Sequence, residues 1–152
     1  MHSLGGKICS RMSPPEMTSA FDALATRCHG DWRRLLRTRA NVLVTLPREL
    51  FDAFGSATRD TFQQPVACVR GTGPSSLPPC KTLILVDLHR LAADDQRRLV
   101  AWLSDPANAD SQVVSLTSES LIQRVDEGRF DAALFYRLNT IHLDLTLVRP
   151  IA

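Results

Sequence analysis

The stretch TLILVDLHRL, residues 82–91, decides the fold predicted for this chain. Residues 83–86 are all apolar, which is typical of a parallel strand covered by helices on both faces. Asp87 follows at the carboxyl end, where open α/β sheets place the groups that handle ligands. Two interpretations of Asp87 stay open: a ligand-handling carboxylate, or an aspartate that caps the next helix.

A second stretch, EGRFDAALFYRLN at residues 127–139, gives this strand its context. It follows QRRLVAWL at residues 96–103 and VVSLTS at residues 113–118. Together these pieces resemble the sigma-54-interacting AAA+ domain of bacterial enhancer-binding transcription activators. That family carries motifs close to GTLFLDEIGEL, QxKLLRxLQ, ATN and EGRFRxDLYYRLN, in this order. The match needs no gaps over residues 112–145.

The alternation of strands and helices predicts an α/β domain. The resemblance implies a three-layer, P-loop NTPase-like core with a parallel five-stranded sheet, in which the first strand is central. We expect a flexible leader at residues 1–13 and the domain at residues 14–152. The family's helical lid and helix-turn-helix domain would follow this point, so neither the lid nor direct DNA binding is expected here.

Composition sets broad limits on function. The chain has 152 residues, 44% hydrophobic and 22% charged, which is typical of one globular domain. A net charge of +2 does not by itself indicate nucleic-acid binding. The sequence contains no apolar run of membrane-spanning length and no secretory signal, which favours the cytoplasm. The four cysteines have no metal-ligand spacing, so we expect reduced thiols, Cys68 in the core, and no metal.

The amino-terminal region predicts two helices. SPPE at residues 13–16 is a helix-start pattern, and Gly30 is expected to end that helix. The next helical segment carries a basic run: Arg33, Arg34, Arg37 and Arg39. This run either contacts phosphate or a partner, or is the solvated face of an amphipathic helix, and we prefer the second interpretation.

The phosphate loop is where this chain departs most from the family. In the family the first strand, here residues 41–45, leads into GESGTGKE, whose glycines and Lys surround phosphates. This chain continues with LPRELFDAF, without a glycine before Gly55. Arg48 is either a remaining phosphate contact or, as we prefer, a surface arginine at a helix start. ATP and Mg²⁺ are therefore expected to bind weakly or not at all.

The acidic pair and the sensor of the family are also altered. Where the family has Asp-Glu for magnesium and the attacking water, this chain has Val86 and Asp87. Thr117 and Ser118 stand where the family has Thr-Asn, whose Asn senses the terminal phosphate. Ser118 is either a shorter substitute for that Asn or a cap of the following helix, with Leu121 and Ile122 pointing inward. Capping is the preferred interpretation.

In the family, two arginines of the last motif act on the neighbouring subunit's nucleotide. The first of these positions is Asp131 here, and the second is Arg137. Phe130, Leu134 and Leu138 form an apolar stripe that is expected to anchor this helical segment to the sheet. Arg137 falls outside the stripe, at the edge of the domain. There Arg137 is expected to pair with Asp131, with Asp87 or with another subunit.

Three functions remain open. The first is a degenerate regulatory AAA+ module that binds a protein partner or itself and does not hydrolyse ATP. The second is a weak ATP-binding subunit that oligomerises with related ATPases in sigma-54-dependent transcription. The third is an unrelated enzyme, for which the sequence shows no nucleophile–base pair. The Pro/Gly/Ser-rich interval at residues 70–81 lacks the GAFTGA segment that touches sigma-54 in the family. We prefer the first function, and sigma-54 RNA polymerase is a partner by resemblance alone.

Overall fold

The computed structural model describes residues 13–70 and 79–146. Nearly all of the predicted leader, and most of the interval at residues 70–81, lie outside the described residues. The strands are β1 (Val42–Thr45), β2 (Val66–Arg70), β3 (Thr82–Val86), β4 (Gln112–Thr117) and β5 (Ile141–Asp144). The helices are α2 (Pro14–His29), α3 (Trp32–Arg37), α4 (Phe51–Thr58), α5 (Ala93–Ser104), α6 (Leu121–Asp126) and α7 (Ala132–Leu138). Short 3₁₀ turns are η1 (Arg48–Leu50), η2 (Leu88–Arg90) and η3 (Pro106–Asn108).

The strands form one parallel sheet of five strands in the order β2-β3-β4-β1-β5. The predicted α/β class and five-stranded parallel sheet are therefore confirmed. The middle position belongs to β4, and β1 lies beside it as an internal strand, so the expectation of a central first strand holds only in part. All six residues of β4 are buried, as is normal for a strand with neighbours on both edges and helices on both faces.

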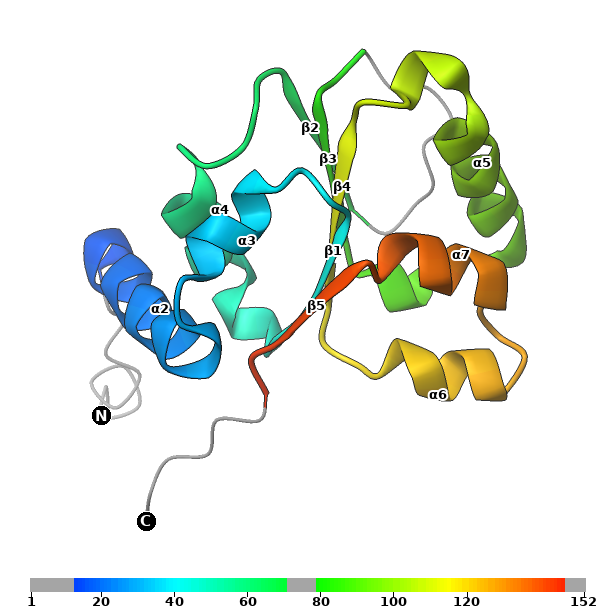
Figure 1. Cartoon of the computed structure of the whole chain (residues 1–152). Helices are drawn as coiled ribbons and strands as arrows, with labels where there is room; N and C mark the ends of the chain where they lie inside the picture. Colours follow the sequence, from blue (N-terminus) through cyan, green and yellow to red (C-terminus); the bar gives the residue numbers. More distant parts are fainter. Residues whose placement is uncertain (1–12, 71–78, 147–152) are drawn as a thin grey trace, which may run out of the picture.

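Helices cover both faces of the sheet, which gives the predicted three layers (Figure 1). The layer of α2, α3 and α4 lies on one side, and the layer of α5, α6 and α7 on the other. Alternate residues of β1 serve the two faces: Val42 and Val44 enter one apolar cluster, and Leu43 enters the other. Removing the side chains of these two clusters from water provides most of the hydrophobic contribution to the free energy of folding.

Local sequence signals position the first layer. Ser13 caps α2 in a capping box, with Glu16 bonded back to the Ser13 N–H. Gly30 ends α2 with a positive φ of 57°, which glycine adopts without strain. Within α2, Phe21 packs edge-on against the rings of Trp32 and Phe54, with centroid distances of 5.5 and 5.6 Å.

The prediction that Cys68 is a core residue is wrong. Cys68 lies on the edge strand β2 and is exposed, because a hollow remains there between β2 and α4. The three cysteines that the structure describes, Cys28, Cys68 and Cys80, are all free thiols.

Candidate functional site

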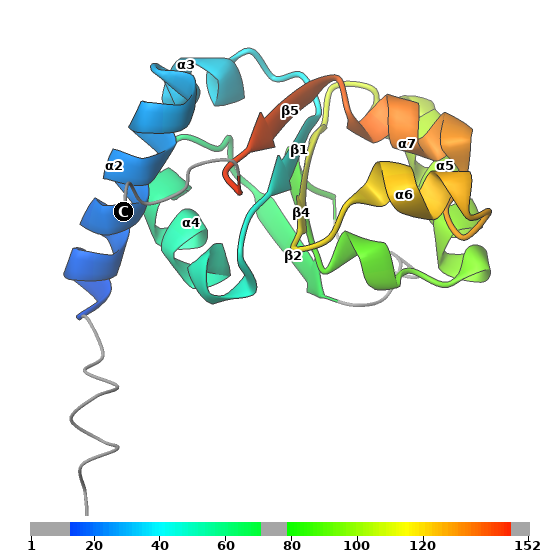
Figure 2. The same cartoon turned by 90° about the horizontal axis from the view of Figure 1, so that it is seen from below.

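The carboxyl ends of β1, β3 and β4 lie at the same end of the sheet. Figure 2 shows the molecule from this end. Four of the five residues singled out from the sequence follow or end these strands: Arg48, Asp87, Thr117 and Ser118. The topology therefore brings together residues that are far apart along the chain, as expected for parallel strands.

Arg48 and Asp87 form an ion pair across this end of the sheet. The Arg48 Nη2 atom lies 2.8 Å from the Asp87 Oδ1 atom, without the angles of a hydrogen bond. The Asp87 side chain is 5% exposed, whereas that of Arg48 is 45% exposed. Arg48 begins η1, as the surface-arginine interpretation predicted, but its guanidinium neutralises a buried carboxylate.

Asp87 has an unusual backbone conformation. Its φ of 61° and ψ of 45° are left-handed, a region that Asp tolerates better than most residues that carry a Cβ. Although Asp87 stands at the start of η2, its side chain accepts no capping hydrogen bond. The interpretation of Asp87 as a helix-capping residue is therefore wrong, and the carboxylate points to Arg48 instead.

The chain that leaves β1 stands where the resemblance implies the family's phosphate loop. Leu46 is fully buried, and its N–H donates to the Thr117 carbonyl at 3.0 Å. Pro47 supplies no N–H, and η1 then runs into α4. At the end of β3, on the far side of β4 from β1, Val86 is 5% exposed and packs in the core. This part of the chain thus places apolar side chains where the family has loop amides and a magnesium carboxylate.

Thr117 is the centre of a buried polar network. Its hydroxyl donates to the Glu119 carbonyl at 2.9 Å and accepts the Glu119 N–H at 3.1 Å. The same oxygen lies 3.0 Å from Nδ1 of His89. These bonds shape the turn between β4 and α6.

Ser118 does not cap the following helix, contrary to our preferred interpretation. The cap of α6 is Ser120, whose hydroxyl accepts the Gln123 N–H at 3.4 Å. The Thr117–Glu119 turn lies between the strand and the helix, and this shifts the helix start beyond the range of Ser118. Leu121 is buried as expected, but Ile122 is 45% exposed.

His89 was not singled out from the sequence, yet it is buried within this network. Its side chain is 2% exposed, and Nε2 lies 3.4 Å from the Glu119 carboxylate, which also binds Arg124 at 2.9 Å. Burial lowers the pKa of His89, and the Glu119 charge opposes this only partly. The only sequence signal was its place two residues after Asp87, at the end of a buried strand.

Arg137 lies apart from the other predicted site residues. Its guanidinium donates to the Ser104 hydroxyl and the Leu103 carbonyl, both at 2.9 Å, at the end of α5. Asp131 instead caps α7 by accepting the Leu134 N–H at 2.8 Å. The expected pairing of Arg137 with Asp131 or Asp87 is therefore wrong. The predicted apolar stripe is confirmed, since all three of its members are buried: Phe130, Leu134 and Leu138.

Two members of the basic run, Arg33 in α3 and Arg39 after it, are bonded to other parts of the domain. Arg33 lies 2.7 Å from Asp22, donates to the Ala57 carbonyl at 3.2 Å and stacks 4.7 Å above the Trp32 ring. Arg39 donates to Gln63 at the surface. These contacts favour a structural role for the run over phosphate binding.

Comparison with solved structures identifies the class of fold. The fold is that of the P-loop NTPase domain of sigma-54 activators. A structure of such a domain from E. coli matches with a TM-score of 0.51 and 17% identity, covering 74% of this chain and 92% of that one. NtrX from Brucella abortus in complex with ADP matches with a TM-score of 0.56 and 16% identity, covering 89% and 37%.

The sequence comparison shows which proteins the carboxyl-terminal half of the chain is similar to. Residues 76–147 match the family described as the Sigma-54 interaction domain. The DNA-binding transcriptional regulator NtrC of Escherichia coli strain K12 is 35% identical over an alignment of 78 residues, which covers 45% of this chain and 17% of that regulator. NtrC of Salmonella typhimurium is 33% identical over a stretch of the same length. The resemblance seen in the sequence is thereby confirmed, and the chain spans a small part of these regulators.

Two further observations concern the described residues. None of their helices combines the length and apolar character needed to cross a membrane. Nor do three or more of their His, Cys, Asp or Glu side chains gather as a metal-binding group.

Proposed function

We propose that this chain is a degenerate sigma-54-interaction AAA+ domain that regulates transcription by binding a protein and does not hydrolyse ATP. The match of residues 76–147 to the Sigma-54 interaction domain supports a role in sigma-54-dependent transcription. The proposal includes a protein partner or a homo-oligomer, a bacterial cytoplasmic location and no direct contact with DNA. Sigma-54 RNA polymerase is one such partner by similarity.

The Arg48–Asp87 ion pair carries this proposal. In a working P-loop ATPase a cation and an acidic pair face the nucleotide phosphates and magnesium. Here Arg48, at the loop position, neutralises Asp87, the carboxylate that follows β3, at 2.8 Å. A buried carboxylate that is already paired has little to gain from magnesium, and the paired guanidinium is less available to phosphate.

The surrounding residues do not fit a magnesium nucleotide. A phosphate cradle needs successive free backbone N–H groups in a glycine-rich turn. The described chain between β1 and α4 has no glycine, and the Leu46 N–H is already bonded to Thr117. Val86 adds an apolar side chain at the expected magnesium carboxylate.

A weak nucleotide-binding subunit that oligomerises with related ATPases is the second candidate. Arg137 favours it, because this exposed arginine stands at the family's finger position and needs a γ-phosphate from another subunit. In this chain, however, the guanidinium already donates twice to the end of α5. A finger role requires both of these surface bonds to break.

Calorimetric titration with ATP and magnesium tests the proposal. We expect no saturable binding up to a nucleotide concentration of about 1 mM, a limit set by the weakest affinities of interest. NtrX from Brucella abortus, which has been solved in complex with ADP, serves as the positive control. A dissociation constant in the low micromolar range that is lost in Arg48→Ala would overturn the proposal and favour the second candidate.

A further inference from the structure

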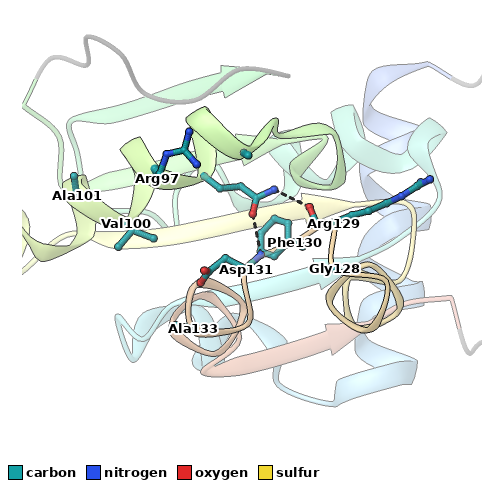
Figure 3. A pocket seen from close by; sticks show the side chains of 10 residues that line it. Arg97, Val100, Ala101, Gly128, Arg129, Phe130, Asp131 and Ala133 are labelled. Carbon is teal, nitrogen blue, oxygen red and sulfur yellow. Dashed lines mark hydrogen bonds between the residues drawn. The ribbon is translucent and has the colours of Figure 1, made fainter.

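A hollow between α5 and the segment that leads into α7 has walls that Gln96 joins by hydrogen bonds (Figure 3). The two arginines that line it, Arg97 and Arg129, already face Asp94 and Glu127. Their charges are therefore paired within the domain, and they do not select an anionic ligand.

Another hollow, which we call the β5 pocket, lies between the strands β1 and β5 and the helices α6 and α7. It has a volume of about 540 Å³, within the range of pockets that hold small molecules. Leu43, Leu121 and Phe135 line it and are nearly fully buried, whereas Ile122 lines it and is 45% exposed. The β5 pocket therefore offers apolar surface that opens to solvent at Ile122.

Polar side chains of the two strands also line the β5 pocket. His142 and Asp144 lie on the same face of β5, because they are two residues apart along a strand. The hydroxyl of Thr45, on the neighbouring strand β1, lies 2.9 Å from Nε2 of His142. The sheet and this contact position the polar side of the pocket before any ligand binds, which lowers the ordering cost of association.

Asp144 carries a charge that no described cation neutralises. Its Oδ1 atom accepts hydrogen bonds from the Thr146 N–H at 2.9 Å and from the Thr146 hydroxyl at 2.5 Å, and both donors are neutral groups. Among the described residues Asp144 forms no ion pair with a lysine, arginine or histidine side chain. The half-buried carboxylate therefore keeps its negative charge at the pocket.

Neighbouring groups do not offset this charge. The Asp144 N–H donates to Nε2 of His29 at 3.1 Å, so this nitrogen carries no proton and the His29 ring is uncharged. Desolvation holds the pKa of His142 below its ordinary value, so this ring is largely uncharged at pH 7. Glu119, beside the pocket, is paired with Arg124 at 2.9 Å. Asp144 contributes −1 and the Glu119–Arg124 pair contributes zero, so the net charge at the pocket is −1.

The β5 pocket also contains a hydrogen-bond acceptor without a donor. Asn139 lines the pocket, and its Oδ1 atom is buried and makes no hydrogen bond within the described part of the chain. A buried acceptor that is left unpaired costs free energy, which a ligand with an N–H donor recovers. The unpaired carboxylate and the unpaired amide oxygen thus favour the same kind of ligand.

We propose that the β5 pocket binds a small organic cation that carries a primary ammonium group on an apolar body. The ammonium group would pair with the Asp144 carboxylate, and the apolar body would lie against Phe135 and Ile122. An ammonium group has three N–H donors and one positive charge, which match the acceptors and the charge of the pocket. This inference goes beyond the proposed protein-binding function and does not depend on it.

Titration of the full chain with 2-phenylethylamine at pH 7, followed by ¹H–¹⁵N NMR spectra, tests the proposal. We expect saturable shifts of the amide signals of the residues that line the pocket, with a dissociation constant of about 1 mM for a ligand of this size. The neutral analogue 2-phenylethanol should bind about fivefold more weakly, because it lacks the charge. Phenylacetate, which reverses the charge, should not saturate the pocket.

Matched variants locate the site. Asp144→Asn removes the charge and keeps an oxygen for Thr146, so it should weaken 2-phenylethylamine about fivefold and leave 2-phenylethanol unchanged. Ile122→Ala removes the exposed part of the apolar wall and should weaken both ligands. Asp126→Asn in α6 and Tyr136→Ala in α7 change exposed residues outside the pocket and should bind as the wild type does. Melting curves confirm that each variant is folded.

The assignment is overturned if 2-phenylethylamine gives no saturable shifts up to about 10 mM, if 2-phenylethanol binds as tightly, or if Asp144→Asn leaves the affinity unchanged. Tighter binding of Nα-acetyl-lysine methylamide, which mimics a lysine within a protein, would overturn the small-molecule assignment in favour of a protein partner. None of these outcomes affects the titration with ATP, so failure of this proposal and failure of the proposed function are distinguishable.

Discussion

Arg137 and Asp87 lie at opposite ends of the sheet. Asp87 follows the carboxyl end of β3, whereas the Arg137 carbonyl accepts a hydrogen bond of 3.0 Å from Asn41, directly before the amino end of β1. Within one copy of the chain Arg137 is therefore remote from the strand-end cluster. Any action of Arg137 on such a cluster has to occur in another subunit.

Arg137→Ala should leave the domain folded and change its free energy of unfolding by about 1 kcal/mol or less, as for exposed polar contacts. The lost bonds go to Ser104 and Leu103 at the surface. Self-association or partner binding should weaken in the variant. Melting temperature and sedimentation measure the two effects, and Arg98→Ala is the control for loss of an exposed arginine. A large loss of stability with unchanged association would contradict the interface role.

Arg48→Ala should destabilise the fold by about 1–3 kcal/mol, because it leaves the buried Asp87 carboxylate without its cation. Asp87→Asn removes the carboxylate charge itself, and asparagine also tolerates a positive φ. The double variant should lose about 1 kcal/mol less than the sum of the single losses, as for residues in contact. Urea unfolding of the four proteins measures the coupling. Strict additivity would show that the ion pair contributes nothing.

Periodicity and capping chemistry predicted the elements well, because both act within a few residues. The helix start at Ser13 and the buried stripe of Phe130, Leu134 and Leu138 were foreseen on this basis. The turn at residues 118–120 between β4 and α6 was enough to move the cap from Ser118 to Ser120. Local cap chemistry does not distinguish serines so close together.

The site was harder to predict because its contacts join distant segments. Arg48 and Asp87 were each singled out, but their pairing depends on how β1 and β3 are placed around β4. His89 gave no motif, and its importance comes from burial against Thr117 and Glu119. Such contacts follow from the topology rather than from spacing along the sequence.

Asp87→Gly should be more stable than Asp87→Ala by about 1 kcal/mol, since glycine adopts a left-handed φ without strain. Both variants remove the carboxylate, so the comparison isolates the backbone at φ 61°. Position 49, an exposed residue of the ordinary 3₁₀ turn η1, is the control. There Glu49→Ala should be at least as stable as Glu49→Gly. Thermal unfolding of the four variants gives the answer, and a more stable Asp87→Ala would argue against strain at this residue.

The chain should not activate sigma-54 transcription by itself. The interval between PVACV and TLILV contains no GAFTGA segment, which resemblance to the family implies is the contact with sigma-54. A reconstituted assay with sigma-54 RNA polymerase should yield no open complexes with this chain as sole activator, while NtrC serves as the positive control. Open complexes formed by the chain alone would refute the expectation.

Stability should fall as the pH drops below about 6.5, because burial holds the pKa of His89 in the folded chain below the ordinary value of a histidine, 6.5. The unfolded chain then binds the proton first, and the loss grows until the pH reaches the folded pKa. Charged groups around the ring are Glu119, Arg124, Asp87 and Arg90. Glu119 titrates at lower pH, since its hydrogen bond with Arg124 lowers its pKa. Between pH 5 and 8, the change in stability with pH therefore reports on the protonation of histidine.

His89→Gln should flatten this pH dependence, because glutamine stays neutral and can still bond to Thr117 and Glu119. Urea unfolding at pH 5, 6, 7 and 8 measures the slope for wild type and variant. His142→Gln is the matched control, since burial also lowers the pKa of His142, and it should remove only its own share of the slope. A His89→Gln variant with the slope of the wild type would show that the buried ring is not the group that makes the fold sensitive to acid.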